Sequence, residues 1–351
     1  MERIRALVDD ALAAPLGSAA AVSVGDGGRE VFRYHSGFVR RVPDRGSPLD
    51  ENTVFDLASV SKPMATVAIA MVLVGEGRLD LDSPVRRYVP VAATEATVRQ
   101  LLAHGAGCSA HVEFFRRLRT ERPGDPRATL VELAAREKCD PAGVASIYSD
   151  LGFIVLGAVL ERAAGMPLED AFADLVAGPL GLTSARYAKT PIDGAVATEL
   201  DDRGLVAGLV HDENCYFGGR VAGHAGVFAT LADVAGFAAA IVDTAAGTPR
   251  GRFDPRTVNE FFTSAPIPGS SWRLGWDTPS HTPGVSQAGD RWPRVGAVGH
   301  TGFTGTSLWL DLPNRRWVAL LTNRVHPTRH GTADAIKALR RAVNDAAIDE
   351  L

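Results

Sequence analysis

The chain has 351 residues, 46% hydrophobic and 22% charged, and 37 Lys and Arg stand against 41 Asp and Glu for a formal net charge of −4. This composition indicates a globular protein of one large or two smaller domains and excludes disordered, collagen-like and coiled-coil chains. The slight acidic balance disfavours a nucleic-acid partner. The three cysteines, Cys108, Cys139 and Cys215, are widely spaced without a CxxC pattern, so they indicate neither a disulfide framework nor a zinc ribbon.

The first 17 residues predict a short amphipathic helix. Asp9 and Asp10 lie where an export signal would need an apolar run. The longest apolar run, Met64 to Val74, is too short to span a bilayer. We therefore expect a cytoplasmic protein without a membrane partner, and the sequence leaves its oligomeric state open.

Strands are expected at about 18–25 and 29–39, on either side of a Gly-Asp-Gly-Gly turn, and a short strand at 53–56. Helical spacing of apolar residues then dominates, over about 61–75, 97–103, 127–137, 150–164, 167–177, 231–243 and 255–262. Short β-rich segments at 272–276, 296–302, 306–312 and 316–323 predict an antiparallel meander. A helix over about 331–348 closes the chain.

Strands at both ends with helices between them predict an α+β fold. The two ends would share an antiparallel sheet of about five strands, flanked by the N- and C-terminal helices. The expected division is a sheet region, 1–60 and 245–351, and a large, mainly helical insertion, 61–244. The active site is expected between these two regions.

A serine and a lysine lie one helical turn apart in Ser59-Val60-Ser61-Lys62, at the start of the 61–75 helix. A serine hydroxyl becomes a nucleophile when a base takes its proton, and a lysine on the same helix face can take it. The start of a helix also offers backbone N–H groups to a developing oxyanion. The alternative is a capped helix with a surface lysine.

Two further motifs follow. Tyr148-Ser149-Asp150 opens the apolar helix 150–164, where Ser149 or Asp150 could also be a simple helix cap. His300-Thr301-Gly302 ends the strand 296–302. The chance that all three motifs occur in this order is on the order of 10⁻⁴.

SVSK, YSD and HTG in this order resemble the serine β-lactamase and penicillin-binding-protein superfamily. The resemblance is strongest to its class C-like branch of esterases and peptidases, where Tyr occupies the second motif and His often replaces the Lys of the third. The segments TVFDLASVSKPM, GRLDLDSPVRRYVP, VRQLLAHGAG, YSDLGFIVLGAVLE and GHTGFTGTSLWLDL extend it over about residues 18–345. It implies a β-lactamase/transpeptidase-like fold and a serine hydrolase that needs no cofactor.

The resemblance makes Ser59 the acylated nucleophile, Lys62 its proton acceptor and Tyr148 the group that relays a proton to the leaving group. It also implies an oxyanion hole built from the backbone N–H groups of Ser59 and Phe303. Asp150 stands where the family commonly has Asn. This departure leaves open whether Asp150 only orients Lys62 or adds a charge that keeps Lys62 protonated.

The residues expected to contact substrate are Asp150, His300, Thr301, Gly302, Asp212 and His224. Asp212 and His224 belong to a Gly-rich stretch of the kind that rims pockets in similar hydrolases, and they either touch substrate or stabilise that loop. No metal site is expected, because no pair of histidines has the spacing of a helical metal site.

We therefore expect a serine hydrolase that cleaves a small ester or amide through an acyl-enzyme on Ser59. Alternatives within the superfamily are an acyltransferase, a β-lactamase or a D-alanyl peptidase, of which the last two fit poorly with a chain lacking an export signal. A non-catalytic ligand-binding or sensor protein is the alternative from another class. His300, with an ordinary pKa near ~6.5, is mostly neutral at pH 7. A substrate without a free carboxylate is therefore expected, unless Arg220 or another cation supplies the charge.

Overall fold

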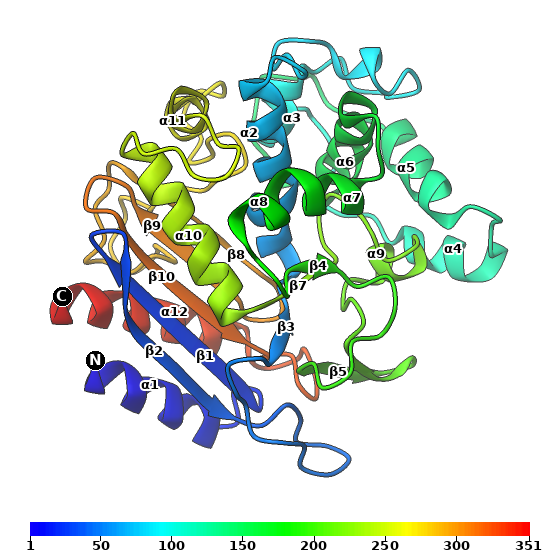
Figure 1. Ribbon diagram of the computed structural model, residues 1–351. Helices are drawn as coiled ribbons and strands as arrows, with labels where there is room; N and C mark the ends of the chain where they lie inside the picture. Colours follow the sequence, from blue (N-terminus) through cyan, green and yellow to red (C-terminus); the bar gives the residue numbers. More distant parts are fainter.

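The two ends of the chain form one antiparallel five-stranded sheet with strand order β2-β1-β10-β9-β8 (Figure 1). In the computed structural model, which describes residues 1–351, its strands are β1 (Ala19–Asp26), β2 (Arg29–Gly37), β8 (Ala297–Thr301), β9 (Ser307–Asp311) and β10 (Arg316–Thr322). β1 pairs with β10 so that Val22 lies opposite Leu320. The α+β fold and the five-stranded antiparallel sheet expected from the sequence are thus confirmed.

Both faces of this sheet are covered (Figure 1). Helices α1 (Glu2–Ala13) and α12 (Ala333–Glu350) pack on one face over a core of 18 buried residues that includes Val22 and Val343. Helix α10 (Leu231–Ala245) packs on the other face, within a core of 82 residues that includes Ala21. Neighbouring residues of a strand point to opposite faces, so β1 is apolar at nearly every position. The expected region boundary at residue 244 falls at the end of α10.

The region between the two halves of the sheet is mainly helical, and its longest apolar segment runs through its centre. That segment begins with the short turn η1 (Ala58–Val60), continues as the π-helical turn η2 (Lys62–Val67) and ends as α2 (Ala68–Gly75). Residues 58–75 are long and apolar enough to cross a membrane, but 83% of the segment is buried inside the protein. It is therefore packed as a core helix in this fold.

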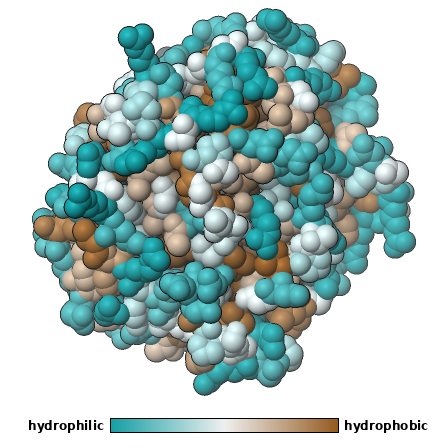
Figure 2. Space-filling view, viewed as in Figure 1, coloured by the Kyte–Doolittle hydropathy of each residue, from teal (hydrophilic) through white to brown (hydrophobic).

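The remaining helices surround this segment. They are η3 (Val85–Arg87), α3 (Val98–Leu102), α4 (Phe114–Glu121), α5 (Pro126–Arg136), α6 (Asp150–Ala164), α7 (Leu168–Phe172), η4 (Ala173–Ala177), α8 (Gly178–Leu180), α9 (Glu213–Phe217) and α11 (Pro255–Thr263). Figure 2 shows an outer surface on which hydrophilic side chains alternate with small apolar patches.

Small strands join the two regions, and of these the sequence predicted only β3, as the short strand at 53–56. β3 (Val54–Asp56) pairs with β7 (Val227–Thr230), which also pairs with β4 (Arg186–Tyr187). β5 (Ala197–Asp201) and β6 (Gly204–Ala207) form a separate hairpin.

The prediction of a strand at 272–276 is wrong. The segment is a tight turn in which the N–H of Arg273 donates to Trp276 O at 2.7 Å. Gly275 has φ +81°, and a Cβ there would lie 2.1 Å from a methyl carbon of Val67. Only glycine fits that conformation at so close an approach, so the segment turns where its apolar residues suggested extension.

Candidate active site

A strained turn presents Ser59 at the junction of β3 and the central apolar segment. Ala58, directly before Ser59, has φ +47°, which is uncommon for a residue with a side chain. The carboxylate of Asp56 holds this turn by accepting hydrogen bonds from the N–H of Ala58 at 2.8 Å and of His211 at 2.7 Å. The turn after β8 is attached to the same segment, because Thr306 Oγ1 donates to Leu57 O at 2.8 Å.

The Lys62 ammonium lies at the centre of the polar network. Its Nζ is 3.0 Å from Ser59 Oγ, 2.6 Å from Tyr148 Oη, 2.7 Å from Asp150 Oδ1 and 3.2 Å from His224 O. Burial acts to lower the pKa of Lys62, but the Asp150 charge and the contact with Tyr148 outweigh it and raise the pKa to about 12. Lys62 is therefore protonated at rest.

Tyr148 is held by the start of α6 and by three aromatic neighbours. Ser149 caps α6 by accepting from the N–H of Gly152 at 3.0 Å. The Tyr148 ring centroid lies 4.8 Å from that of His104, 5.4 Å from that of Trp272 and 5.9 Å from that of His300. Burial raises the pKa of Tyr148, so its phenol is neutral and carries a proton to give.

Asp150 occupies the first turn of α6, where a helix favours negative charge. Burial acts to raise its pKa, but the Lys62 ammonium and His111, whose Nδ1 is 3.5 Å from Asp150 Oδ2, hold it well below its usual range. Asp150 is therefore ionised. Of the two roles left open by the sequence, the geometry favours a charge that keeps Lys62 protonated.

His300 is neutral, and its hydrogen bond fixes which nitrogen carries the proton. Nδ1 lies 2.8 Å from Thr301 O, and a carbonyl oxygen can only accept, so the proton is on Nδ1. Nε2 is a buried acceptor without a partner in the protein. Burial and the nearby Lys62 charge lower the pKa of His300 to about 3, well below the ordinary value assumed from the sequence.

The two N–H groups expected to form the oxyanion hole, those of Ser59 and Phe303, have no acceptor within the protein. The carbonyl groups around Phe303 are instead held by two arginines. Arg324 Nε donates to Phe303 O at 2.8 Å, and Arg340 Nη2 donates to Gly302 O at 2.6 Å and Thr306 O at 2.8 Å. The turn is thus fixed while its Phe303 N–H stays available.

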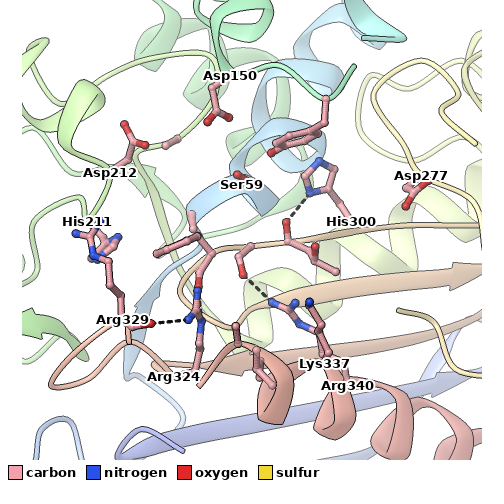
Figure 3. Close-up of a pocket in the computed structure, with 18 of the residues that line it drawn as sticks. Ser59, Asp150, His211, Asp212, Asp277, His300, Arg324, Arg329, Lys337 and Arg340 are labelled. Carbon is pink, nitrogen blue, oxygen red and sulfur yellow. Dashed lines mark hydrogen bonds between the residues drawn. The ribbon is translucent and has the colours of Figure 1, made fainter. Parts of the chain in front are cut away.

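These groups open into one pocket of about 570 Å³ (Figure 3). The pocket is lined by the following residues expected from the sequence: Ser59, Tyr148, Asp150, Asp212, His300, Thr301, Gly302 and Phe303. Figure 3 shows Ser59 between a side with Asp150 and Asp212 and a side with Arg324, Arg329 and Arg340.

His224 is placed differently from Asp212. It is only 1% exposed, and its Nε2 lies 2.8 Å from Asp212 Oδ1. It therefore holds Asp212 from behind, while Asp212 itself lines the pocket.

Sequence reasoning assigned no role in hydrolysis to His104, His111, Trp272, Arg324 or Arg340. His104 lies in the segment VRQLLAHGAG, and its Nδ1 accepts from the N–H of Ser149 at 3.1 Å. Trp272 was placed on the strand that proved to be a turn. No three His, Cys, Asp or Glu side chains converge as a metal site would require.

The Beta-lactamase family model matches residues 4–342 of this chain. The putative D-alanyl-D-alanine carboxypeptidase of Salmonella agona (strain SL483) is 27% identical over 311 residues, which cover 78% of this chain and 70% of the relative. Among solved structures, EstCE1, a hydrolase with promiscuous acyltransferase activity, superposes with a TM-score of 0.73 at 22% identity, with 98% of both chains covered. The octameric penicillin-binding protein homologue from Pyrococcus abyssi gives a TM-score of 0.71 at 20% identity, with 92% of this chain and 73% of that chain covered.

Proposed function

This chain belongs to the beta-lactamase family and is a serine hydrolase of that superfamily, and from this premise we propose that it cleaves a small ester or amide through an acyl-enzyme on Ser59. The observation that carries the proposal is the position of Lys62 Nζ. It lies 3.0 Å from Ser59 Oγ and 2.6 Å from Tyr148 Oη. Lys62 itself is fully buried, while Ser59 and Tyr148 line a pocket of about 570 Å³.

In the proposed acylation step, Ser59 Oγ attacks the substrate carbonyl carbon and its proton passes to the neutral form of Lys62. The carbonyl oxygen becomes an oxyanion that accepts hydrogen bonds from the N–H groups of Ser59 and Phe303. Tyr148 then gives its proton to the departing oxygen or nitrogen and regains one from Lys62. Water cleaves the acyl-enzyme through the same groups in reverse order.

The test is covalent labelling. We expect incubation with p-nitrophenyl acetate to leave an acetyl adduct on Ser59 in the intact mass spectrum. Ser59→Ala should show no adduct and lose turnover by at least about 10³-fold, while keeping its melting temperature because the side chain is small. Ser36→Ala, a change of the same chemistry on β2, is the control. An adduct on Ser61, or one that persists in Ser59→Ala, would overturn the assignment.

A second candidate is cleavage of a substrate that carries a carboxylate, as a D-alanyl peptidase would require. Arg324 and Arg340 line the pocket, and their guanidinium groups bond only carbonyl and hydroxyl oxygens of the protein. Burial and the Arg324 charge lower the pKa of Arg340 to about 9, which reflects a cation without a counter-ion.

Three of the four acids that line the pocket already have partners in the protein: Asp150 with Lys62, Asp212 with His224, and Glu213 with Arg329. The fourth, Asp277, accepts a hydrogen bond from the N–H of Thr278 at 2.9 Å. Arg220, considered from the sequence, bonds Lys189 O at 3.1 Å and is not among the pocket residues. An anionic substrate group near Arg324 and Arg340 would supply the acidic partner that neither guanidinium group has in the protein.

A matched pair of esters separates the candidates. If the substrate carries a carboxylate, kcat/KM should be higher for p-nitrophenyl hemisuccinate than for p-nitrophenyl butyrate. Arg324→Gln should then reduce the ratio of the two kcat/KM values about tenfold, the scale of one charge-assisted hydrogen bond. Arg341→Gln removes the same charge from a partly exposed position of α12 outside the pocket and should leave the ratio unchanged. Equal rates for the two esters in both proteins would leave the neutral ester or amide as the substrate class.

A further inference from the structure

Two cysteines that are distant in the sequence lie in contact beside the site. Cys108 follows α3 and Cys139 follows α5, yet their Sγ atoms are 3.7 Å apart, and both are free thiols. The adjoining backbones are already bonded, with the N–H of Asp140 donating to Gly107 O at 2.8 Å. Cys108 is buried, while Cys139 is partly exposed.

The segments that carry these cysteines also hold the polar network. The segment 104–111 provides His104, which packs on Tyr148, and His111, which lies 3.5 Å from Asp150. The segment 137–148 ends in Tyr148. The two segments meet again beyond Tyr148, where Ser149 Oγ donates to Ser109 O at 2.6 Å. A covalent bond between the cysteines would therefore tie together the two segments that position Tyr148 and Asp150.

We propose that Cys108 and Cys139 are a redox pair that a hydroperoxide converts into a reversible disulfide. The Cys139 thiolate attacks one oxygen of hydrogen peroxide, the O–O bond breaks, and the products are a sulfenic acid on Cys139 and, after protonation, one water. Cys108 sulfur then attacks the Cys139 sulfur and displaces hydroxide, which takes the Cys108 proton to form a second water. Two thiols lose two electrons and two protons, and the peroxide is reduced to two waters.

The environment of each sulfur fits this order of events. Contact with the Cys108 thiol lowers the pKa of Cys139, and the same contact together with burial raises that of Cys108. A partly exposed thiol of lowered pKa with a second thiol in contact is the arrangement of redox-sensing cysteines. Cys215 is an internal contrast, because it is fully buried, its sulfur hydrogen-bonds only Ala225 O at 3.4 Å, and burial raises its pKa.

The test counts thiols in the full chain before and after hydrogen peroxide. Alkylation of the protein unfolded in urea should label three cysteines in the reduced sample and one, Cys215, in the peroxide-treated sample, and a non-reducing peptide map of the latter should contain a Cys108–Cys139 cross-link. Dithiothreitol should restore all three. Because the cross-link closes a long loop in the unfolded chain, the melting temperature should rise by several degrees on oxidation and fall back on reduction.

Variants assign the order of attack. Cys108→Ser should stop at a dimedone-reactive sulfenic acid on Cys139, Cys139→Ser should leave Cys108 a thiol, and Cys215→Ser should keep the cross-link. Three free thiols after peroxide, or cross-links only between chains, would overturn the proposal. These readouts need no enzymatic turnover, so they are independent of the function proposed for Ser59, and the wild-type peptide map remains decisive if a variant does not fold.

Discussion

At the scale of single residues, the substitution of Asp for the more usual Asn at position 150 has the largest chemical consequence. Lys62 can accept the Ser59 proton only as a neutral amine, and the Asp150 carboxylate at 2.7 Å makes that form a minor one at neutral pH. The hydrolase should therefore gain activity as the pH rises toward the pKa of Lys62. The same ion pair also fixes the position of the amine.

We predict that Asp150→Asn moves the rising limb of the pH profile of kcat/KM to lower pH by at least about one unit, with about a tenfold gain at pH 7. The sign follows from the causes of the shift: without the Asp150 charge, burial remains and lowers the pKa of Lys62. Ester hydrolysis between pH 5 and 10 measures it. Asp277→Asn, which removes a pocket carboxylate that bonds neither Lys62 nor Tyr148, is the control, and an unshifted limb in Asp150→Asn would contradict the prediction.

His300 shows what a sequence motif can and cannot supply. The motif placed the residue on the pocket wall, and the structure brings it there. Its charge state could not be predicted, because burial and the nearby Lys62 ammonium lower its pKa, and both arise only when the chain folds. For Asp150 the sequence was more informative. Its departure from Asn already raised the question whether this residue keeps Lys62 protonated, and the geometry answers it.

At the scale of elements, the β5–β6 hairpin is fastened beneath the pocket by one carboxylate. Glu199 of β5 accepts from the N–H of Arg329 at 3.0 Å and from Arg329 Nε at 2.6 Å, and lies 2.9 Å from His211 Nε2. Burial acts to raise the pKa of Glu199, but these hydrogen bonds outweigh it and lower the pKa from 4.5 to about 2. The ionised carboxylate therefore stabilises the folded state.

We predict that Glu199→Gln lowers the free energy of unfolding at pH 7 by about 3 kcal/mol, from the pKa difference between the two states. Because the folded-state pKa is the lower one, this contribution is complete above pH 4.5 and is lost as the pH falls toward about 2. Urea unfolding should show that the wild type exceeds Glu199→Gln in free energy of unfolding by less at pH 3 than at pH 7. Glu121→Gln, in an exposed pair with Arg117, should change stability by less than about 1 kcal/mol at either pH. An equal advantage at both pH values would contradict the role of this carboxylate.

Elements differed in how far the sequence could predict them. The hairpin of β1 and β2, the strands β8 to β10 and the closing helix follow from alternation, turn residues and helical spacing within each segment. β4 and β7 have only two and four residues and are strands because of distant partners, so no local pattern marks them. The 272–276 segment contains two tryptophans, but the space beside Val67 allows only a turn at Gly275.

At the scale of the whole molecule, the sheet separates two cores of unequal size. The smaller core of 18 residues lies under α1 and α12, and the larger core of 82 residues contains the central apolar segment. The meeting of the chain ends could be predicted from strands at both ends. The contact between Cys108 and Cys139 could not, because it depends on how two loops pack. Residues of both regions line the pocket, since η1, β8 and α12 of the sheet region supply one part and the starts of α6 and α9 in the helical region supply the other.

The smaller core can be weakened at Ile4, which does not line the pocket. Ile4 of α1 is fully buried in that core, so Ile4→Ala should lower the free energy of unfolding by about 2–4 kcal/mol through lost burial and the cavity left behind. The ester kcat/KM should be unchanged under native conditions, because Ile4 neither lines the pocket nor bonds Ser59, Lys62 or Tyr148. Ala6→Ser, at an exposed position of the same helix, is the control.

Each core contains tryptophan, with Trp292 and Trp309 in the smaller one and Trp276 and Trp317 in the larger. Successive residues of β1 and β10 belong alternately to the two cores, so we expect both cores to unfold together. In Ile4→Ala, as in the wild type, fluorescence and enzymatic activity should be lost in one coincident transition, which lies at a lower urea concentration in the variant. If activity persisted beyond a first fluorescence transition, the small core would be unfolding by itself, and the sheet would not couple the chain ends to the active site.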